Sequence, residues 1–517
     1  MLTHDSAAAG WRGFGSTMAP TARSSADTPI IPGFFPDPSI CRAGEDYVIV
    51  HSTFEYSPAV PLWHSRDLVN WTLAGHALDG DPRFVPGNAR AGGGVYAPTI
   101  RHHDGRFWMI TTDVSGGKGQ LITSATEITG PWMPSVRIDG ILGIDPDLAW
   151  DSDGTCYVTF SSNDQRAPGI AQVRVDLAEG RVIEGPYTVY EGTGAAYPEG
   201  PHLFRRGPWW YLLFAEGGTE RGHCISVARG TSPTGPFHAN PNNPILTRRS
   251  TTFPVQNTGH GDLVECVDGS WALVYLGVRP RGGTPMWHTN GRETFLAGID
   301  WVDDWPVVVP DRFDLPDAST GFVDRFDTDR LDLRWISPGP AIAEFAHPTS
   351  DGVVISPASS QHGVPGVLAT RTRDLAWRFE AELAAGSTGT VHLRMDDHHW
   401  CEVRRTSTGV EVEVVIGQVR QVFLADSRDP AVLCVAALAP TFGGPDDLTF
   451  AVRDADGERE LARIDGRYLS TEVAGGFVGR VIGLRALHEP AVFRQARYEP
   501  GEDPAVPVWN IDEPPTA

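Results

Sequence analysis

The sequence is short of positive charge and of long apolar runs. It has 42 lysines and arginines against 65 aspartates and glutamates, which gives a formal net charge of −23 at pH 7. A nucleic-acid backbone or an anionic membrane surface would be repelled by this charge, so we expect neither as a partner. No window approaches the roughly 18 apolar residues that a membrane-spanning helix needs. The N-terminus also lacks the continuous apolar segment of a secretion signal, so we expect a cytoplasmic protein with a disordered leader over residues 1–28.

Cysteine is scarce as well, and no Cys-x-x-Cys pair occurs. The six cysteines lie at positions 41, 156, 224, 266, 401 and 434. Because they are scattered through a large chain and flanked by apolar residues, we expect buried thiols in preference to disulfides.

Glycine and proline, in contrast, are abundant, with 57 and 42 residues in a chain of 517. This composition favours many short strands and turns over long helices. The hydrophobic content of 41% and the charged content of 21% are those of a folded globular protein. The chain is too long for one ordinary core, and its length predicts two domains.

One pattern occurs five times in the first 310 residues. Each copy has a small or proline-rich start, the beginning of an apolar strand, a glycine-containing turn and an aromatic-rich apolar run. The copies begin at Phe35, Tyr96, Ile144, Glu199 and Gly259. Successive copies start roughly fifty to sixty residues apart, which is within reach of a four-stranded propeller blade. We therefore predict a five-bladed β-propeller over residues 29–312, with a sandwich of generic β-hairpins as the weaker alternative.

Chemically interesting side chains recur at the same point of each copy, three or four residues before the apolar residue that opens the strand. The residues at this point are Asp37, Ala97, Asp145, Glu199 and His260. In a propeller this is where the innermost strand of each blade begins, beside the central channel. Three carboxylates that are far apart in the sequence would then converge on one pocket.

The pattern of apolar and polar residues changes at about residue 320. Apolar and polar residues alternate there, with Asp-Gly turns between the runs. This pattern predicts an antiparallel β-sandwich over residues 320–500, which makes the whole chain all-β. An acidic, proline-rich tail follows at residues 501–517.

Two carboxylates flanking a bond suffice for hydrolysis of a glycoside. One must be ionised to act as a general base, whereas the other must hold a proton, which burial or a neighbouring negative charge provides. A third carboxylate near the acid is a simple source of that charge. Three acids on separate blades suit this division of labour.

Four motifs in order carry a resemblance to a known family. PGFFPDPSI, GIDPDLAWDSDG, EGPHLF, and TGHGDLVECVDG followed by GRET resemble glycoside hydrolase family 43, especially its β-xylosidase-like members. The resemblance covers residues 29–310 and extends to the C-terminal region. There FVDRFDTDRLDLRW and GGFVGRVIGLRAL look like the β-sandwich appended to those β-xylosidases. It implies a five-bladed propeller that hydrolyses pentosides with inversion of the anomeric configuration.

The same resemblance implies a role for each of the three carboxylates. Asp37 would be the general base that activates water, and Glu199 would be the general acid that protonates the leaving oxygen. Asp145 would adjust the pKa of that acid and orient it. In an inverting site the base and the acid should lie roughly 6.5–9.5 Å apart to admit a water molecule.

Further residues match substrate-binding positions of the family. These residues are Phe54, Tyr96, Thr219, His260, Arg292 and Phe477. Arg292 resembles the arginine that contacts substrate hydroxyls and the catalytic carboxylates, and Phe477 is the phenylalanine that the sandwich offers to close the pocket. His260 resembles the channel histidine, which in related enzymes faces a metal ion or water. The family commonly has Trp where Tyr96 stands and Asn where Phe35 stands.

The resemblance implies a small oligosaccharide substrate and no required cofactor. Catalysis by carboxylates needs no metal, so a calcium ion in the channel would be structural or supporting. The sequence leaves the oligomeric state open, and a homo-oligomer is compatible with it.

We expect an exo-acting inverting β-1,4-xylosidase that releases xylose from the non-reducing ends of short xylo-oligosaccharides. An α-L-arabinofuranosidase is the close alternative, because both pentoses present similar hydroxyl geometry to a pocket. A noncatalytic carbohydrate-binding propeller is the alternative from another class. The complete set of three acids argues against that last alternative, because binding alone needs neither a base nor an acid.

Overall fold

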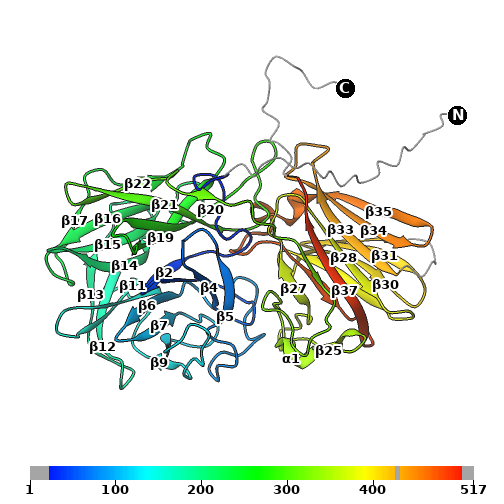
Figure 1. The fold of residues 1–517 in the computed structure, drawn as a ribbon, viewed down its shortest axis with the longest axis horizontal. Coiled ribbons are helices and arrows are strands. Elements are labelled where there is room, and N and C mark those ends of the chain that lie inside the picture. Colours follow the sequence, from blue (N-terminus) through cyan, green and yellow to red (C-terminus); the bar gives the residue numbers. More distant parts are fainter. Residues whose placement is uncertain (1–22, 425–430, 503–517) are drawn as a thin grey trace, which may run out of the picture.

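The computed structural model describes residues 23–424 and 431–502, and strands dominate it (Figure 1). Helical turns within these ranges are confined to α1 (Ile342–Phe345), η1 (Gly466–Leu469) and α2 (Thr471–Ala474). None of the helices described is long and apolar enough to cross a membrane. The prediction of an all-β chain is therefore confirmed. Residues 1–22 of the expected leader, and residues 503–517 of the expected tail, lie outside the described residues.

Five antiparallel sheets follow one another along the first part of the chain. The first sheet contains β2 (Ser39–Ala43), β3 (Asp46–Val50), β4 (Pro61–Ser65) and β5 (Thr72–His76). The second contains β6 (Thr99–His103), β7 (Arg106–Thr111), β8 (Gln120–Ala125) and β9 (Val136–Ile138). The third contains β10 (Gly143–Trp150), β11 (Cys156–Ser162), β12 (Gly169–Asp176) and β13 (Arg181–Tyr190). The fourth contains β14 (Glu199–Arg206), β15 (Trp209–Glu216), β16 (Cys224–Gly230), β17 (His238–Ala239) and β18 (Leu246–Thr247). The fifth contains β19 (Gln256–Glu265), β20 (Trp271–Val278), β21 (Glu293–Val302) and β22 (Trp305–Val309).

Each copy of the sequence pattern forms the first hairpin of one sheet. Its turn contains a glycine in the left-handed region, such as Gly44 between β2 and β3 or Gly207 between β14 and β15. The aromatic-rich run that follows is the second strand, and in β15 every residue after Trp209 is buried. The repeat in the sequence is therefore a repeat of β-hairpins that bury their second strand.

The five sheets form a closed ring. Their first strands contact one another in chain order, β2 beside β6, β6 beside β10, β10 beside β14 and β14 beside β19, and β19 returns to β2. The segment ahead of β2 fastens this closure: the Ile30 N–H donates to Thr294 O over 2.9 Å and the Phe35 N–H donates to Arg292 O over 3.1 Å. Asp37 comes directly after these hydrogen-bonded residues, so it lies where the last sheet meets the first.

The end of the expected leader differs from the prediction. Residues 23–24 form strand β1 (Arg23–Ser24), which pairs with β23 (Asp314–Leu315) near the end of the ring. The partner of this strand lies about 290 residues away, so no local pattern could reveal the pairing.

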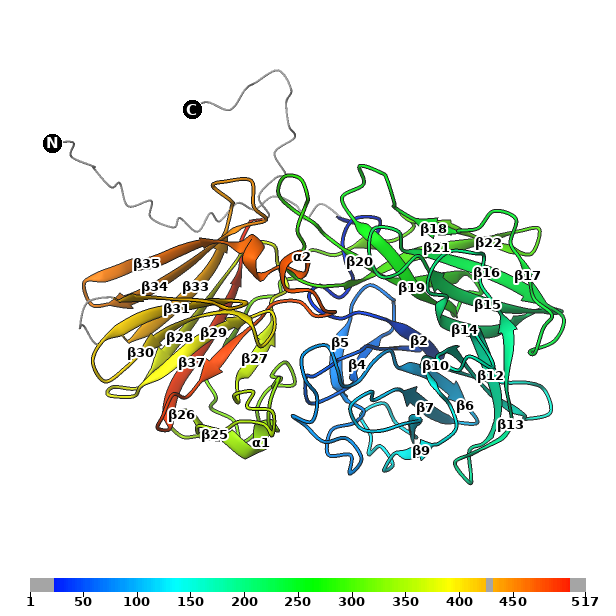
Figure 2. The same cartoon turned by 180° about the vertical axis from the view of Figure 1, so that it is seen from behind.

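The C-terminal part consists of two sheets that share one hydrophobic core. One sheet contains β24 (Phe322–Asp324), β25 (Ala346–Thr349), β26 (Gly352–Ile355), β28 (Trp377–Leu383), β33 (Val432–Leu438), β34 (Asp447–Asp454), β35 (Gly457–Asp465) and β37 (Ala491–Pro500). The other contains β27 (Leu368–Arg371), β29 (Gly389–Arg394), β30 (His399–Arg405), β31 (Val410–Ile416), β32 (Val419–Leu424) and β36 (Val481–Arg485). This part is the predicted antiparallel sandwich, and Figure 2 shows it beside the ring with α2 at the junction.

The two parts are joined by a hydrophobic cluster with members from both. Phe34, Phe54 and Tyr56 of the ring pack there with Val478 and Val481 of the sandwich, among others. The adjacent Phe35, where the family commonly has Asn, has its own role in this packing. Its ring meets the ring of Trp63 edge-on at 5.1 Å, and the guanidinium of Arg371 lies 4.4 Å above it. Phe35 therefore supports the junction and does not line the cavity described below.

All six cysteines are buried and free. The expectation of buried thiols is therefore confirmed.

Candidate active site

One cavity of about 280 Å³ contains the common position of all five repeats. The residues at that position are Asp37, Ala97, Asp145, Glu199 and His260. The same cavity is lined by Phe54, Tyr96, Thr219, Arg292 and Phe477. All nine residues selected from the sequence as site residues therefore meet in one place. Asp37, Asp145, Glu199 and His260 come together because the first strands of neighbouring sheets lie side by side in the ring.

The backbone of this cavity is strained at several points. Asp37, Phe54, Asp145, Tyr197 and His260 all have φ between 40° and 55°, a region that residues other than glycine rarely adopt. Such conformations cost about 1–3 kcal/mol each and persist where the surrounding structure fixes them. At Asp37 the prolines on both sides contribute to this fixation by restricting the flanking backbone.

Asp37 is buried and tightly hydrogen-bonded. Ser52 Oγ donates to Asp37 Oδ2 over 2.5 Å, and Arg292 Nη1 donates to Oδ1 over 2.8 Å. The Nδ1 atom of His260 lies 3.6 Å from the same Oδ1. Burial by itself would raise the pKa of this carboxyl, but Arg292, His260 and the Ser52 hydroxyl outweigh it and hold the pKa below its ordinary value. Asp37 is therefore an ionised carboxylate at neutral pH.

The pKa values of Glu199 and Asp145 are shifted in the opposite direction, upwards. Burial, followed by the negative charge of Asp37, raises the pKa of Glu199 to about 7. Burial, followed by the charges of Glu199 and Asp37, raises the pKa of Asp145 well above its ordinary value. The two carboxyls thus retain protons far more readily than exposed acids do. Environments that push the pKa values of neighbouring acids apart mark acid and base roles.

The backbone beside Glu199 ties this acid to its neighbours. The Gly200 N–H donates to Asp145 Oδ2 over 3.0 Å, so Asp145 fixes the start of β14. Gly200 has φ of +56°, and a Cβ atom there would lie 2.8 Å from the ring of His260. Only glycine fits between the acid and this imidazole without displacing one of them.

Three aromatic rings from two parts of the molecule form one wall. Phe54 stacks on Phe477 with centroids 5.4 Å apart and an interplanar angle of 18°. Tyr96 meets Phe54 at 5.1 Å and Phe477 at 6.0 Å, both edge-on. The guanidinium of Arg292 lies 5.5 Å from the centroids of Phe54 and Phe477. The sandwich therefore completes the cavity with a single phenylalanine.

The loop that carries Phe477 is clamped to the ring. Glu472 in α2 accepts two hydrogen bonds from His288, one from the backbone N–H at 2.9 Å and one involving Nδ1 at 2.7 Å. The Arg480 N–H donates to Thr289 O over 2.9 Å on the other side of the loop. Both ends of the segment around Phe477 are thus held by residues 288–289 of the ring.

The guanidinium of Arg101, whose side chain is 17% exposed, binds two buried carboxylates at which the expected calcium can be tested. Arg101 Nη2 donates to Asp147 Oδ1 over 2.6 Å, and Nη1 donates to Asp262 Oδ2 over 2.7 Å. Its Nη2 also lies 2.9 Å from Nδ1 of His202, whose ring is 6.5 Å from that of His260. Calcium takes six to eight oxygen ligands, and the two carboxylates here are already bound by a guanidinium. These two carboxylates are therefore engaged by Arg101 and do not form a calcium site.

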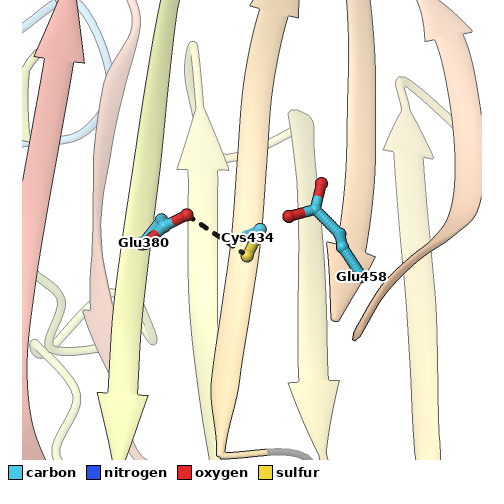
Figure 3. Close-up of side chains that lie close together, drawn as sticks. All are labelled: Glu380, Cys434 and Glu458. Carbon is cyan, nitrogen blue, oxygen red and sulfur yellow. Dashed lines mark hydrogen bonds between the residues drawn. The ribbon is translucent and has the colours of Figure 1, made fainter. Parts of the chain in front are cut away.

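A second group of potential metal ligands lies in the sandwich, where Glu380, Cys434 and Glu458 approach one another (Figure 3). Arg378 pairs with both glutamates, and Arg453 Nη2 contacts Glu380 Oε2 over 2.6 Å. Burial raises the pKa of Cys434 to about 12, so its thiol stays protonated. This group is an ion-pair network and lacks the thiolate that a metal would need.

Some lining residues were not selected from the sequence. Tyr197 and Glu220 line the cavity, and the ring of Tyr197 is largely exposed at its edge. Ser52, which holds Asp37, was overlooked although it stands in the same HSTFEY motif as Phe54. Tyr197 lies two residues before Glu199, and this proximity was the signal available for it.

Comparison with known proteins finds matches to both parts of the chain. The family model described as glycosyl hydrolases family 43 matches residues 26–306. The model described as beta xylosidase C-terminal concanavalin A-like domain matches residues 323–499. These two ranges correspond to the ring and the sandwich.

Several relatives and solved structures are similar to this chain. A non-reducing end alpha-L-arabinofuranosidase of Bacteroides ovatus is 33% identical over 500 residues, covering 90% of this chain and 92% of that one. A xylosidase/arabinosidase of Butyrivibrio fibrisolvens is 41% identical over 297 residues, covering 55% of this chain and 56% of that one, so the match spans little more than half of either protein. The crystal structure of a xylan beta-1,4-xylosidase from Bacillus halodurans has a TM-score of 0.81 at 26% identity, with 92% of this chain and 99% of that one covered.

Proposed function

Since this chain belongs to glycosyl hydrolases family 43 and is a glycoside hydrolase, we propose that it is an inverting exo-acting β-1,4-xylosidase that releases xylose from short xylo-oligosaccharides. In this proposal the ring of five sheets is a five-bladed β-propeller. Residues 29–312 form its catalytic domain and residues 320–500 an accessory sandwich.

The observation that carries this proposal is the opposite protonation of two carboxyls in one cavity. Asp37 has a lowered pKa, whereas the pKa of Glu199 is raised to about 7. Hydrolysis with inversion needs one ionised and one protonated carboxyl on the two sides of the scissile bond. The two acids come from the first and fourth sheets, which gives them different directions of approach.

The proposed reaction is a single displacement. Asp37 takes a proton from a water molecule while the oxygen of that water attacks the anomeric carbon. As the glycosidic bond breaks, Glu199 gives its proton to the leaving oxygen. Asp145 holds the backbone next to Glu199 through the Gly200 N–H and so orients the acid. Arg292 keeps Asp37 ionised and reaches Thr219 Oγ1 at 3.2 Å, close to where sugar hydroxyls would bind. Each carboxyl is used once, so the configuration at the anomeric carbon inverts.

In this proposal the three carboxyl groups and Arg292 perform the displacement without a metal ion. The guanidinium of Arg101 already occupies the carboxylates below the cavity, and burial lowers the pKa of His260 to about 4, which keeps its imidazole neutral. We propose that His260 is a neutral imidazole beside Asp37, with its Nδ1 atom 3.6 Å from Asp37 Oδ1.

The choice of pentose rests on the relatives. The names of a Bacillus subtilis protein, 39% identical over 306 residues, and of the Bacillus halodurans structure both give β-xylosidase activity. The Bacteroides ovatus relative is named for arabinofuranosidase activity, and this keeps α-L-arabinofuranosides as the second candidate substrate. A noncatalytic sugar-binding protein is not favoured, because binding has no use for acids with separated pKa values.

Nitrophenyl β-xyloside and nitrophenyl α-L-arabinofuranoside, assayed side by side, test this choice. Faster turnover of the β-xyloside is expected, with α-xylose as the first product seen by proton NMR. Initial release of β-xylose would contradict inversion, and inactivity on both compounds would contradict the proposed function.

Replacement of the base tests the role of Asp37. Asp37→Ala should lower kcat on xylobiose by at least about 100-fold, because a positioned general base contributes that much or more. Its thermal unfolding should stay cooperative, which separates lost chemistry from lost structure. Full activity of this variant would remove Asp37 from the mechanism.

A further inference from the structure

A second cavity, of about 810 Å³, lies between the sandwich and the ring. Its floor is the outward face of one sandwich sheet, formed by β29, β30 and β31. Loops 90–92 and 362–365 line it as well, and the loop at 474–478 forms a further side. We call this cavity the interdomain cleft. Phe477 lines both the cleft and the catalytic cavity, so one side chain separates them.

The floor of the cleft is polar although it is buried. His392 and Arg394 on β29, and Glu402 and Glu413 on the next two strands, have side chains that are 5%, 2%, 0% and 1% exposed. They alternate with core residues such as Val391, so they share the outward face of the sheet. Buried charged residues are rare unless they are paired or serve a ligand.

The charges on this floor cancel one another. Arg394 Nη2 lies 3.0 Å from Asp397 Oδ1, and His392 Nδ1 lies 2.9 Å from Glu402 Oε2. Arg485 Nη2 lies 3.1 Å from Glu402 Oε1. A charged ligand would have to compete with these pairs, whereas an uncharged polar ligand would use the hydrogen-bonding capacity that they leave over.

Some of that capacity is unsatisfied in the described structure. The Nε atoms of Arg394 and Arg485 are buried and have no hydrogen-bond partner. Buried donors of this kind are normally satisfied by protein, water or a ligand. Both side chains line the cleft, so the guanidinium groups that carry these donors border any ligand bound there.

Trp400 adds an aromatic surface to the same floor. It stands on β30 directly opposite Arg394 on β29, is only partly buried, and leans against the ring of His392 with centroids 5.2 Å apart. A ring with both polar and apolar faces, such as a pyranose, fits an aromatic surface surrounded by planar hydrogen-bonding groups.

We propose that the interdomain cleft is a second binding site, separate from the catalytic cavity, for a neutral oligosaccharide. Trp400 packs against a sugar ring, and the paired arginines and carboxylates bind its hydroxyls. The ligand class rests on the proposed function, because it is the class of chain that the catalytic cavity would cut. The site retains longer chains near the catalytic cavity without taking part in bond cleavage.

Binding can be measured on the full chain carrying Asp37→Ala, which should not hydrolyse the ligand. Isothermal titration with xylotetraose is expected to give two equivalents per chain. Adding Trp400→Ala should remove one equivalent or weaken it roughly tenfold, which corresponds to about 1.4 kcal/mol. The other equivalent should keep its affinity.

Two further variants control this measurement. Trp305→Ala removes a partly buried tryptophan from β22, outside the cleft, and should leave both equivalents unchanged. Trp400→Phe keeps an aromatic ring and should weaken the second equivalent less than Trp400→Ala does. One equivalent in the Asp37→Ala chain, or equal loss in the Trp305→Ala control, would overturn the proposal. Tighter binding of a glucuronic-acid-substituted chain would overturn its neutral specificity.

Hydrolysis of nitrophenyl β-xyloside by the unmodified chain separates this proposal from the proposed function. Trp400→Ala alone should leave kcat/KM on this short substrate unchanged and lower it on xylohexaose severalfold. If no pentoside is hydrolysed but Trp400→Ala still removes one oligosaccharide equivalent, the proposed function fails and the cleft remains a sugar site. Equal losses on both substrates would assign Trp400 a merely structural role.

Discussion

Arg292 Nη1 donates a hydrogen bond to Asp37 Oδ1 over 2.8 Å, although 255 residues separate the two in the chain. The contact joins the last sheet of the ring to the strand start of the first. It couples ring closure to the ionisation of the proposed base, because the position of Arg292 depends on the pairing of residues 30–35 with β21.

Removal of this guanidinium should shift the pH dependence of the enzyme. In Arg292→Met the carboxyl of Asp37 stays buried but loses the guanidinium, which is the largest of the influences that lower its pKa, so the pKa of Asp37 should rise. The acidic limb of the kcat/KM profile should then move to higher pH. Arg312→Met, which removes a surface arginine paired with Asp300, is the control and should leave this limb in place. An unmoved limb in Arg292→Met would mean that another group sets it.

The basic limb should follow Glu199. Activity requires this carboxyl to be protonated, and its pKa is raised to about 7, so kcat/KM should fall as the pH rises through about 7. In Glu199→Gln the limb should disappear on aryl xylosides, whose leaving groups need little protonation, while activity on xylobiose is lost. A basic limb that persists in this variant would assign it to a different group.

The clamp on the Phe477 loop should affect substrate affinity. Glu472→Ala removes both hydrogen bonds from His288 and loosens the aromatic wall, so KM for nitrophenyl β-xyloside should rise roughly tenfold with a smaller change in kcat. Glu472→Gln keeps an acceptor and should recover part of the affinity. Glu489→Ala, at an exposed position of the sandwich, is the control. Equal effects of Glu472→Ala and the control would rule out the clamp.

Loss of the Arg101 guanidinium should destabilise the ring, because its two carboxylate partners are buried. Arg101→Met leaves the carboxylates of Asp147 and Asp262 buried without a counter-ion, which should lower the free energy of unfolding by about 3–5 kcal/mol. Urea denaturation followed by tryptophan fluorescence measures this change. Arg66→Met is a matched loss of an exposed pair with Asp46 and should leave the free energy of unfolding nearly unchanged.

The unmodified chain should be insensitive to chelators. Since Arg101 already neutralises the carboxylates that calcium would need, dialysis against EDTA should change neither the melting temperature nor kcat on nitrophenyl β-xyloside. A loss of activity that calcium restores would show that a cation binds despite Arg101.

Much of the site could be predicted because several of its residues occupy the same position in successive copies of a sequence repeat. The start of each copy fixes where the first strand of a sheet begins, and residues at equivalent strand starts meet when the sheets close into a ring. Asp37, Asp145 and Glu199 were found in this way, without knowledge of any contact. Alternation of polar and apolar residues likewise predicted the sandwich, because strand geometry sends successive side chains to opposite faces.

The sequence by itself thus determined an all-β chain, the buried cysteines and the residues that meet in the cavity. Only the tertiary structure decided the surroundings that set the pKa of each acid, because Arg292 reaches Asp37 from 255 residues away and burial acts on Glu199 and Asp145. It also decided the packing of Phe35, the clamp between Glu472 and His288, and the floor of the interdomain cleft. These features depend on distances between segments that are remote in the chain, and local periodicity carries no information about such distances.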